Sequence, residues 1–191
     1  FCNAWKITGN AGINNAINFL GTTDNADVII KRQNEEALRV YPGGALVGIG
    51  NTSTGVVPIA GFGTRLLWAP AKAAFRAGSI NGAQWDNANV GSGSAAFGAN
   101  NTASASNSFA AGSGNTATGN QSAAFGNNNT VSGQNSLVTG NNNTVSATHA
   151  LVSGNSNNAA GNFSVVFNNT ASSTAAATTS VAGGFQSQTQ A

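Results

Sequence analysis

A repeat of 14 residues fills the second half of the chain and constrains the fold more than any other feature. Aligned on Gly-Ser-Ala-Ala-Phe-Gly at 93–98, the unit returns five times at one spacing, and a seventh unit follows a two-residue insertion. The second position is Ser in all units but one, the sixth is Gly in all but one, and the ninth is Asn in the first five. Such a fixed period marks a stack of structural repeats. The units begin at Gly93, Asn107, Gln121, Asn135, His149, Phe163 and Thr179.

Fourteen residues hold two strands of about five residues and two tight turns, so successive units can stack as parallel strands in a solenoid. Gly at position six and Asn near position nine suit the turns, where positive φ is often required. Asn at one position of successive coils can also form an amide ladder. The sequence therefore predicts an all-β chain ending in a parallel β-roll of about seven coils, roughly 34 Å long at ~4.8 Å per coil.

Small apolar residues at positions four and eleven predict the interior of the roll. A coil this short has room inside only for small side chains, and these positions hold Ala or Val. Position four comprises Ala96, Ala110, Ala124, Val138, Val152, Val166 and Ala182. Position eleven comprises Ala103, Ala117, Val131, Val145 and Ala159 in the first five units.

Large apolar residues occur at positions three and five, which point to the opposite face of the same strand. A continuous apolar stripe on a thin rod is a mating surface. We therefore expect a homo-oligomer in which this seam packs along a symmetry axis. The predicted seam consists of Phe97, Phe109, Phe125, Leu137, Leu151, Val165 and Phe167.

Charge divides the chain into two regions. All seven Lys or Arg and all five Asp or Glu lie between Lys6 and Asp86, and from Asn87 onward only His149 can titrate. The second region therefore offers neither a carboxylate cage for calcium nor a paired acid and base. The scattered cations argue against a nucleic-acid partner, and no apolar run approaches the ~20 residues of a membrane span. We expect an N-terminal β-rich module over 1–92 and the roll over 93–191.

The first half contains short strand patterns. Segments 28–31 and 37–40 flank a turn and predict a hairpin. A third strand is expected over 45–50, a loop over 51–63 and a strand over 65–68. Segment 72–78 fits either a helical turn or a strand.

Few single residues in the chain indicate a catalytic, metal-binding or ligand-binding site. Cys2 is interpreted as a free thiol rather than an interchain disulfide. Asp24 and Asp27 are interpreted as a solvated turn rather than a cation site, and His149 as a polar surface residue. Ser94 and its equivalents lack His and Asp partners. No catalytic residue, metal ligand or cofactor is therefore predicted. Three Trp fit either a sugar-stacking platform or, as we favour, the closed ends of thin β-layers: Trp5, Trp68 and Trp85.

The repeat resembles a known family. Asn-Ser-Phe-Ala-Ala-Gly at 107–112 and Asn-Thr-Val-Ser-Gly at 129–133 are similar to the head repeats of trimeric autotransporter adhesins, the YadA-like heads. The resemblance covers 93–191 and implies a left-handed parallel β-roll of three chains side by side, displayed outside the cell. Segments 18–24, 26–31 and 36–40 resemble modules of phage and phage-like tail fibres. The chain contains no Met, so we expect a mature or processed fragment, without a stalk, membrane anchor or chaperone.

These features predict a non-enzymatic, extracellular, trimeric fibre or adhesin segment that projects from a surface and attaches it to host cells or surfaces. The alternative within this class is a receptor-binding tail fibre of a phage or contractile injection system. The receptor or glycan is not identified. Because every charge and all three Trp precede Asn87, we expect sharp specificity in the first half and a spacer role for the roll.

Two other classes compete with the fibre hypothesis. Thr and Ser at positions ten and twelve would form arrays that match ice: Thr102/Ser104, Thr116/Thr118, Thr130/Ser132 and Thr144/Ser146. An enzyme would have to draw its acids from five residues without evident paired geometry: Asp24, Asp27, Glu35, Glu36 and Asp86. We therefore expect no enzyme activity.

Overall fold

The computed structural model describes residues 11–12, 14, 19–50, 57, 59–169, 172–173, 180–185 and 188–189. The chain forms two compact units, 1–50 and 51–191. The structure is all-β apart from two single turns of 3-10 helix in its described part.

The first unit contains a small antiparallel sheet in the order β1-β2-β3. A two-residue turn joins β1 to β2, and its residues Gln33 and Asn34 have φ of 51° and 64°, the paired positive values of the tightest hairpins. The predicted hairpin and third strand are thereby confirmed. The strands are β1 (Val28–Arg32), β2 (Glu35–Val40) and β3 (Leu46–Gly48).

The second unit begins with an antiparallel pair, β4 (Gly63–Ala69) and β5 (Ala74–Ile80). A 3-10 turn, η1 (Pro70–Lys72), leads from β4 towards β5, so segment 72–78 ends the helical turn at its first residue and is a strand from Ala74 onward. Strand β5 then pairs in parallel with the first strand of the roll. Residues 63–80, which the sequence analysis assigned to the N-terminal module, thus continue the sheet of the roll. Part of the predicted loop over 51–63 (51–56 and 58) lies outside the described residues.

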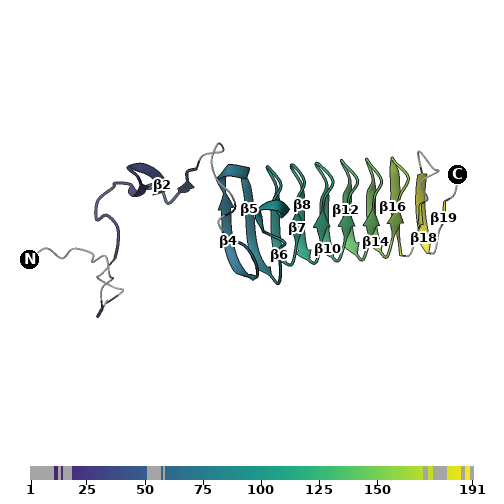
Figure 1. Ribbon diagram of the computed structural model, residues 1–191, viewed down its shortest axis with the longest axis horizontal. Helices are drawn as coiled ribbons and strands as arrows, with labels where there is room; N and C mark the ends of the chain where they lie inside the picture. Colours follow the sequence, from purple (N-terminus) through teal and green to yellow (C-terminus); the bar gives the residue numbers. More distant parts are fainter. Residues whose placement is uncertain are drawn as a thin grey trace, which may run out of the picture. The chain divides into compact units, whose positions relative to one another are not determined.

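Each repeat contributes one long and one short strand. The seven long strands join β4 and β5 in a nine-stranded sheet, and the seven short strands form a separate sheet. Figure 1 shows the coils of this unit stacked side by side. A second 3-10 turn, η2 (Asn87–Asn89), precedes them. The long strands are β6 (Ala95–Ala99), β8 (Phe109–Ser113), β10 (Ala123–Asn127), β12 (Leu137–Asn141), β14 (Leu151–Asn155), β16 (Ser164–Asn169) and β18 (Ser180–Phe185). The short strands are β7 (Thr102–Ala103), β9 (Thr116–Ala117), β11 (Thr130–Val131), β13 (Thr144–Val145), β15 (Asn158–Ala159), β17 (Ser172–Ser173) and β19 (Gln188–Thr189).

The pairing confirms the predicted parallel solenoid of 14-residue coils. Strands of successive coils pair in parallel without a shift, as in Ala124 opposite Val138. Five complete coils, from 93 to 162, lie within the described residues, against the expected seven. The sixth and seventh are described in part, and the pairing of Ser164 with Ser180 places the two-residue insertion between them.

The interior of the roll is the predicted one. Position four in all seven units and position eleven in the first five supply Ala and Val side chains to one core cluster, and each of these side chains is at most 2% exposed. Ser at position two is also buried in the first four coils, and in three of them its hydroxyl donates to a carbonyl three residues earlier in the chain, as from Ser122 to Gly119 at 2.6 Å. Ser136 donates instead to the carbonyls of Gln134 and Ala147. The narrow core of small residues is therefore bordered by buried Ser hydroxyls, each of which has a backbone carbonyl as hydrogen-bond partner.

Asn at position nine forms the predicted amide ladder. The Asn129 side-chain nitrogen donates to the Asn115 side-chain oxygen at 3.0 Å, and the Asn129 oxygen accepts from the side chain of Asn143 at 2.9 Å. In the first four coils the ladder Asn also donates to carbonyls of its own coil and the next, as from Asn129 to Phe125 and Gly140, both at 2.9 Å. These side chains are buried, so the ladder satisfies backbone groups that water cannot reach.

The predicted link between position nine and positive φ is wrong. The left-handed residues occupy positions one and eight instead, as at Asn135 (φ 54°) and Asn128 (φ 52°). Gly at position six does have positive φ, 111° at Gly126, as predicted. A Cβ on Gly126 would also lie 2.0 Å from the carbonyl oxygen of Gly140, so close coil stacking requires glycine there.

The roll begins at two buried residues outside the repeat, Arg76 and Trp85. Arg76 lies opposite Ala96 in the inward row and donates four hydrogen bonds of 2.8–2.9 Å, three to carbonyls and one to the Ser94 hydroxyl. Burial lowers the pKa of the Arg76 guanidinium to about 10. Trp85 is fully buried, and its Nε1 donates to the Asn101 carbonyl at 3.0 Å. These two side chains cover the open end of the narrow core.

Candidate functional site

The outward face of the nine-stranded sheet brings together all seven residues of the predicted seam. In the first coils the large residue alternates between positions five and three, so each Phe lies beside an Ala of the neighbouring strand. Phe109, for example, pairs with Ala95 and Ala123. The rings stack diagonally, with centroids 5.5 Å apart for Phe97 and Phe109 and 5.1 Å for Phe109 and Phe125. Register therefore converts the repeat pattern into one continuous apolar stripe.

Most of this stripe is open to solvent in the single chain. Phe97, Phe109 and Val165 are half-buried. The other four predicted residues are exposed: Phe125 by 37%, Leu137 by 40%, Leu151 by 36% and Phe167 by 53%. Burying such side chains would contribute roughly 25 cal/mol for each Å² removed from water, so the face is suited to contact with another surface.

The stripe also extends beyond the predicted residues. On the antiparallel pair, Trp68 lies opposite Phe75, and the Phe75 ring lies 5.6 Å from that of Phe97. Leu66 and Trp68 are exposed, and Val181 is exposed at the other end. Sequence reasoning missed the first three because 63–80 lacks the repeat. Val181 occupies position three of the seventh unit, and the repeat pattern was sufficient to find it.

A second surface, on the seven-stranded sheet, carries hydroxyl groups. Four Thr at position ten lie in register on successive coils, and Asn158 ends the row. At position twelve, Ser or Thr is half-buried or exposed in the first four coils. The position-ten row consists of Thr102, Thr116, Thr130 and Thr144. The structure therefore aligns the hydroxyl array that the sequence predicted.

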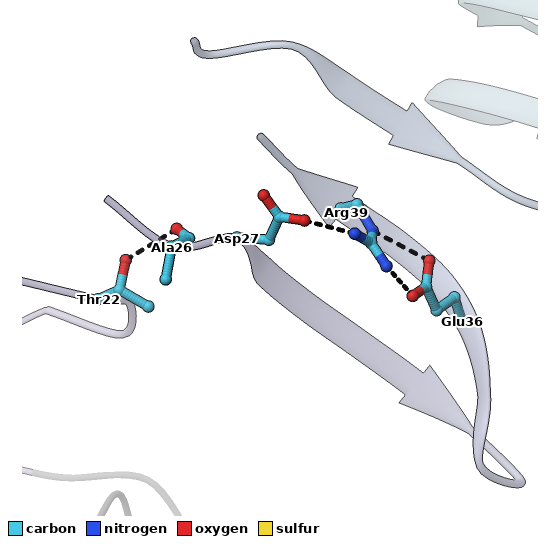
Figure 2. A network of polar contacts seen from close by, with 5 residues as sticks. All are labelled: Thr22, Ala26, Asp27, Glu36 and Arg39. Atoms are coloured by element: carbon cyan, nitrogen blue, oxygen red, sulfur yellow. Dashed lines mark hydrogen bonds and ion pairs between the residues drawn. The ribbon is translucent and has the colours of Figure 1, made fainter. Parts of the chain in front are cut away.

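Two of the four acids in the first unit, Asp27 and Glu36, are engaged in ion pairs with one arginine. Arg39 bridges Asp27 and Glu36 (Figure 2), and its Nε donates to Glu36 at 3.0 Å. The hydrogen bond from Arg39 holds the pKa of the Glu36 carboxyl below its ordinary value, and Glu36 in turn raises the pKa of Arg39. Thr22 donates to the carbonyl of Ala26 beside this network. The predicted solvated turn at Asp27 is thus an ion pair in the structure.

The remaining candidate residues lie apart from one another. An Asp86 carboxylate oxygen accepts from the Gly61 backbone at 2.6 Å. Among the described residues, no three His, Cys, Asp or Glu side chains gather in a metal-binding arrangement. Over the same ranges, no helix is long and apolar enough to cross a membrane. Cys2 and Trp5 lie outside the described residues.

The two described Trp differ in their surroundings. Trp85 is buried and closes an end of the roll, as the favoured interpretation predicted, whereas Trp68 lies exposed on the apolar stripe. The two residues do not form a common platform on one surface.

His149 begins the fifth coil at the edge of the roll. Its ring stacks on Phe163, with centroids 4.9 Å apart and planes 9° from parallel. The His149 Nε2 lies 3.3 Å from the side-chain nitrogen of Asn135.

Comparison of the chain with protein-family models, with curated proteins and with solved structures finds no match.

Proposed function

We propose that this chain is a non-enzymatic segment of an extracellular trimeric fibre or adhesin, which projects from a surface and attaches it to host cells or surfaces. The observation that carries this proposal is the apolar stripe on the outward face of the nine-stranded sheet. Large exposed apolar patches mark interaction sites, and this one follows the whole length of the described roll. Three copies meeting along one axis bury it and leave the hydroxyl-bearing sheets outside.

The first unit also supports self-association. Its sheet carries apolar residues on both faces, including Ile29, Ile30 and Leu46, all exposed. Every residue among 19–50 is at least partly exposed. A sheet of three short strands needs further packing for independent stability, and neighbouring copies supply it. The resemblance of the repeats to YadA-like heads favours the trimer among possible assemblies.

The neutral, regular surface of the roll fits exposure outside the cell. A rod of stacked coils presents the same groups many times, and three parallel copies multiply each weak contact by multivalency. A tail fibre of a phage or contractile injection system uses the same geometry and stays the alternative within this class. Both alternatives place the chain on the outside of a cell or particle.

The test measures the mass of the full chain in solution by light scattering and its attachment to cultured cells. We expect three times the 18.9 kDa chain mass and attachment that the purified chain inhibits. A monomer at micromolar concentration contradicts the trimer, and a trimer without attachment to any cell type contradicts the adhesive role. Display of 1–50 and of 51–191 on separate trimerising scaffolds then locates the binding surface, with the cut placed between the two compact units.

A second candidate function, ice binding, is favoured by one specific observation: the position-ten hydroxyls lie in register over four coils. The row is short, and Ser replaces Thr at position twelve in three of these coils. A thermal-hysteresis assay of the full chain decides this candidate, because an ice-binding face depresses the freezing point without a matching shift in melting.

A further inference from the structure

The edge column formed by position one is not uniform. Each described coil begins with a residue in the left-handed conformation, with φ from 54° to 66° between Gly93 and Phe163. Gly and Asn accept this conformation readily, whereas a bulky side chain there is an outlier. Phe163 nevertheless has φ 59° and is 54% exposed. Burial in the core therefore does not explain why a phenylalanine occupies this position. A strained residue without a packing role indicates a functional constraint.

The neighbours of Phe163 extend this feature along the edge. The Phe163 ring lies face to face with His149, and His149 contacts the Asn135 amide. Three successive coils thus place an exposed aromatic ring, a second ring and an amide in one row. The earlier coils have only Gly, Asn or Gln at this position. The row is therefore a local feature of the roll rather than a consequence of its repeat.

We propose that the row formed by Phe163, His149 and Asn135, here called the edge row, binds a neutral saccharide. A flat aromatic face packs against the apolar face of a sugar ring, and a few placed amides fix the orientation of its hydroxyls. From Asn87 onward the chain has no Lys, Arg, Asp or Glu, so a phosphate or carboxylate ligand meets no opposite charge. Neutral glycan chemistry is what these groups recognise.

This inference rests on the proposed function, because it names the ligand class of the adhesive roll. It departs from the expectation that the roll is only a spacer. That expectation assumed one repeated neutral surface, which the edge row interrupts.

The strain at Phe163 provides a direct way to separate binding from packing. Phe163→Asn installs the residue that the same column has at Asn107 and Asn135, at φ of 55° and 54°. If the ring serves binding, this variant keeps or raises the melting temperature and loses the ligand. If the ring serves packing or self-association, the melting temperature or the mass falls.

The experiment uses the full-length chain on an array of neutral and sialylated oligosaccharides. We expect binding to at least one neutral oligosaccharide, with at least a tenfold loss for Phe163→Asn and His149→Asn and no loss for the matched control Gln121→Asn in the same column. The chain has one His, so the imidazole proton resonances of His149 report on the site alone. They should shift when the oligosaccharide selected on the array is added.

Each result supports or overturns the edge row. Equal binding by Phe163→Asn, an unmoved His149 resonance, or a lower melting temperature or mass for Phe163→Asn overturns it. If the native chain and Phe163→Asn attach to cells equally well, the adhesive function stands and only the edge row is rejected as the binding site. A native chain that binds neither glycans nor cells overturns both proposals.

Discussion

The amide ladder makes a sharp prediction for Asn129→Asp. The two residues have the same shape, so the substitution exchanges one NH₂ group for an oxygen. In the native chain that NH₂ group is surrounded by three oxygens at 2.9–3.0 Å, on Asn115, Phe125 and Gly140. The new oxygen would oppose all three in a site that is fully buried.

The size of the effect depends on pH. A protonated Asp still donates one hydrogen bond, so at low pH the variant loses about 1–3 kcal/mol. Ionisation adds a buried charge beside acceptors, and full burial raises a carboxyl pKa by up to about 3–5 units, or about 4–7 kcal/mol. Because the folded state then holds the proton more tightly than the unfolded state, stability falls as pH rises from about 4 to the raised pKa and is constant above it.

The assay is thermal unfolding of the full-length chain between pH 4 and pH 9, with amide exchange at Asn143, whose backbone N–H donates to Asn129. We expect nearly constant melting of the native roll, in which only His149 can titrate from Asn87 onward. Asn129→Asp should melt lower at every pH and roughly 10–35 °C lower at pH 8. The adjacent exposed Asn128→Asp is the matched control. If Asn129→Asp melts at the same temperature as the native chain, or lower by an amount that does not change with pH, the claim that the buried ladder stabilises the roll is refuted.

Three further predictions address the seam, the coil spacing and the ion-pair network. Phe125→Asp puts a carboxylate into the proposed seam, at a cost of roughly several kcal/mol per chain, so light scattering should show loss of the trimer; an intact trimer with native melting means that the seam is misassigned. Gly126→Ala should destabilise the roll strongly, since its Cβ would meet a carbonyl at 2.0 Å, whereas Gly43→Ala, with no atom within 4 Å, should not; equal melting of the two variants argues against tight coil stacking. The ion pair of Glu36 with Arg39 stabilises the folded hairpin fully above the ordinary Glu36 pKa of 4.5, and this stabilisation is lost as the pH falls through the lowered pKa. Acid should therefore increase amide exchange in the β1–β2 hairpin, and Glu36→Gln should abolish this acid response. An acid response that Glu36→Gln leaves unchanged contradicts the prediction.

Most of the roll was predictable because in-register pairing turns each repeat position into a column. Once the period was known, small residues such as Ala124 and Val138 had to share the interior and their neighbours had to face outward. The error at position nine was avoidable. Position eight holds Gly114 and Ser156 as well as Asn, whereas position nine holds Asn in all five coils. A left-handed turn accepts Gly, but an amide ladder requires an amide at every step, so the residue types distinguish the two roles.

The start of the roll was not predictable in the same way. Arg76 lies opposite Ala96, 20 residues later, and the segment between them follows no period. The sequence presents Arg76 as one of several scattered cations, and only the structure shows it fully buried, donating to three carbonyls and a hydroxyl. A residue at the end of a stack has a neighbour on one side only, so the repeat does not specify it.

The outward face of this same non-repeating hairpin bears on the proposed assembly. Packing inside the coil constrains only the inward row, which here contains Leu67 and Arg76. The outward row nevertheless continues the large and small alternation of the repeats, with Phe75 beside Ala95 and Ala77 beside Phe97. Nothing within a single chain requires this continuity, since Trp68 and Leu66 at its end are exposed. A surface that contacts the full length of the sheet does require it, which is why the apolar stripe, and not the coil, is the strongest argument for neighbouring copies.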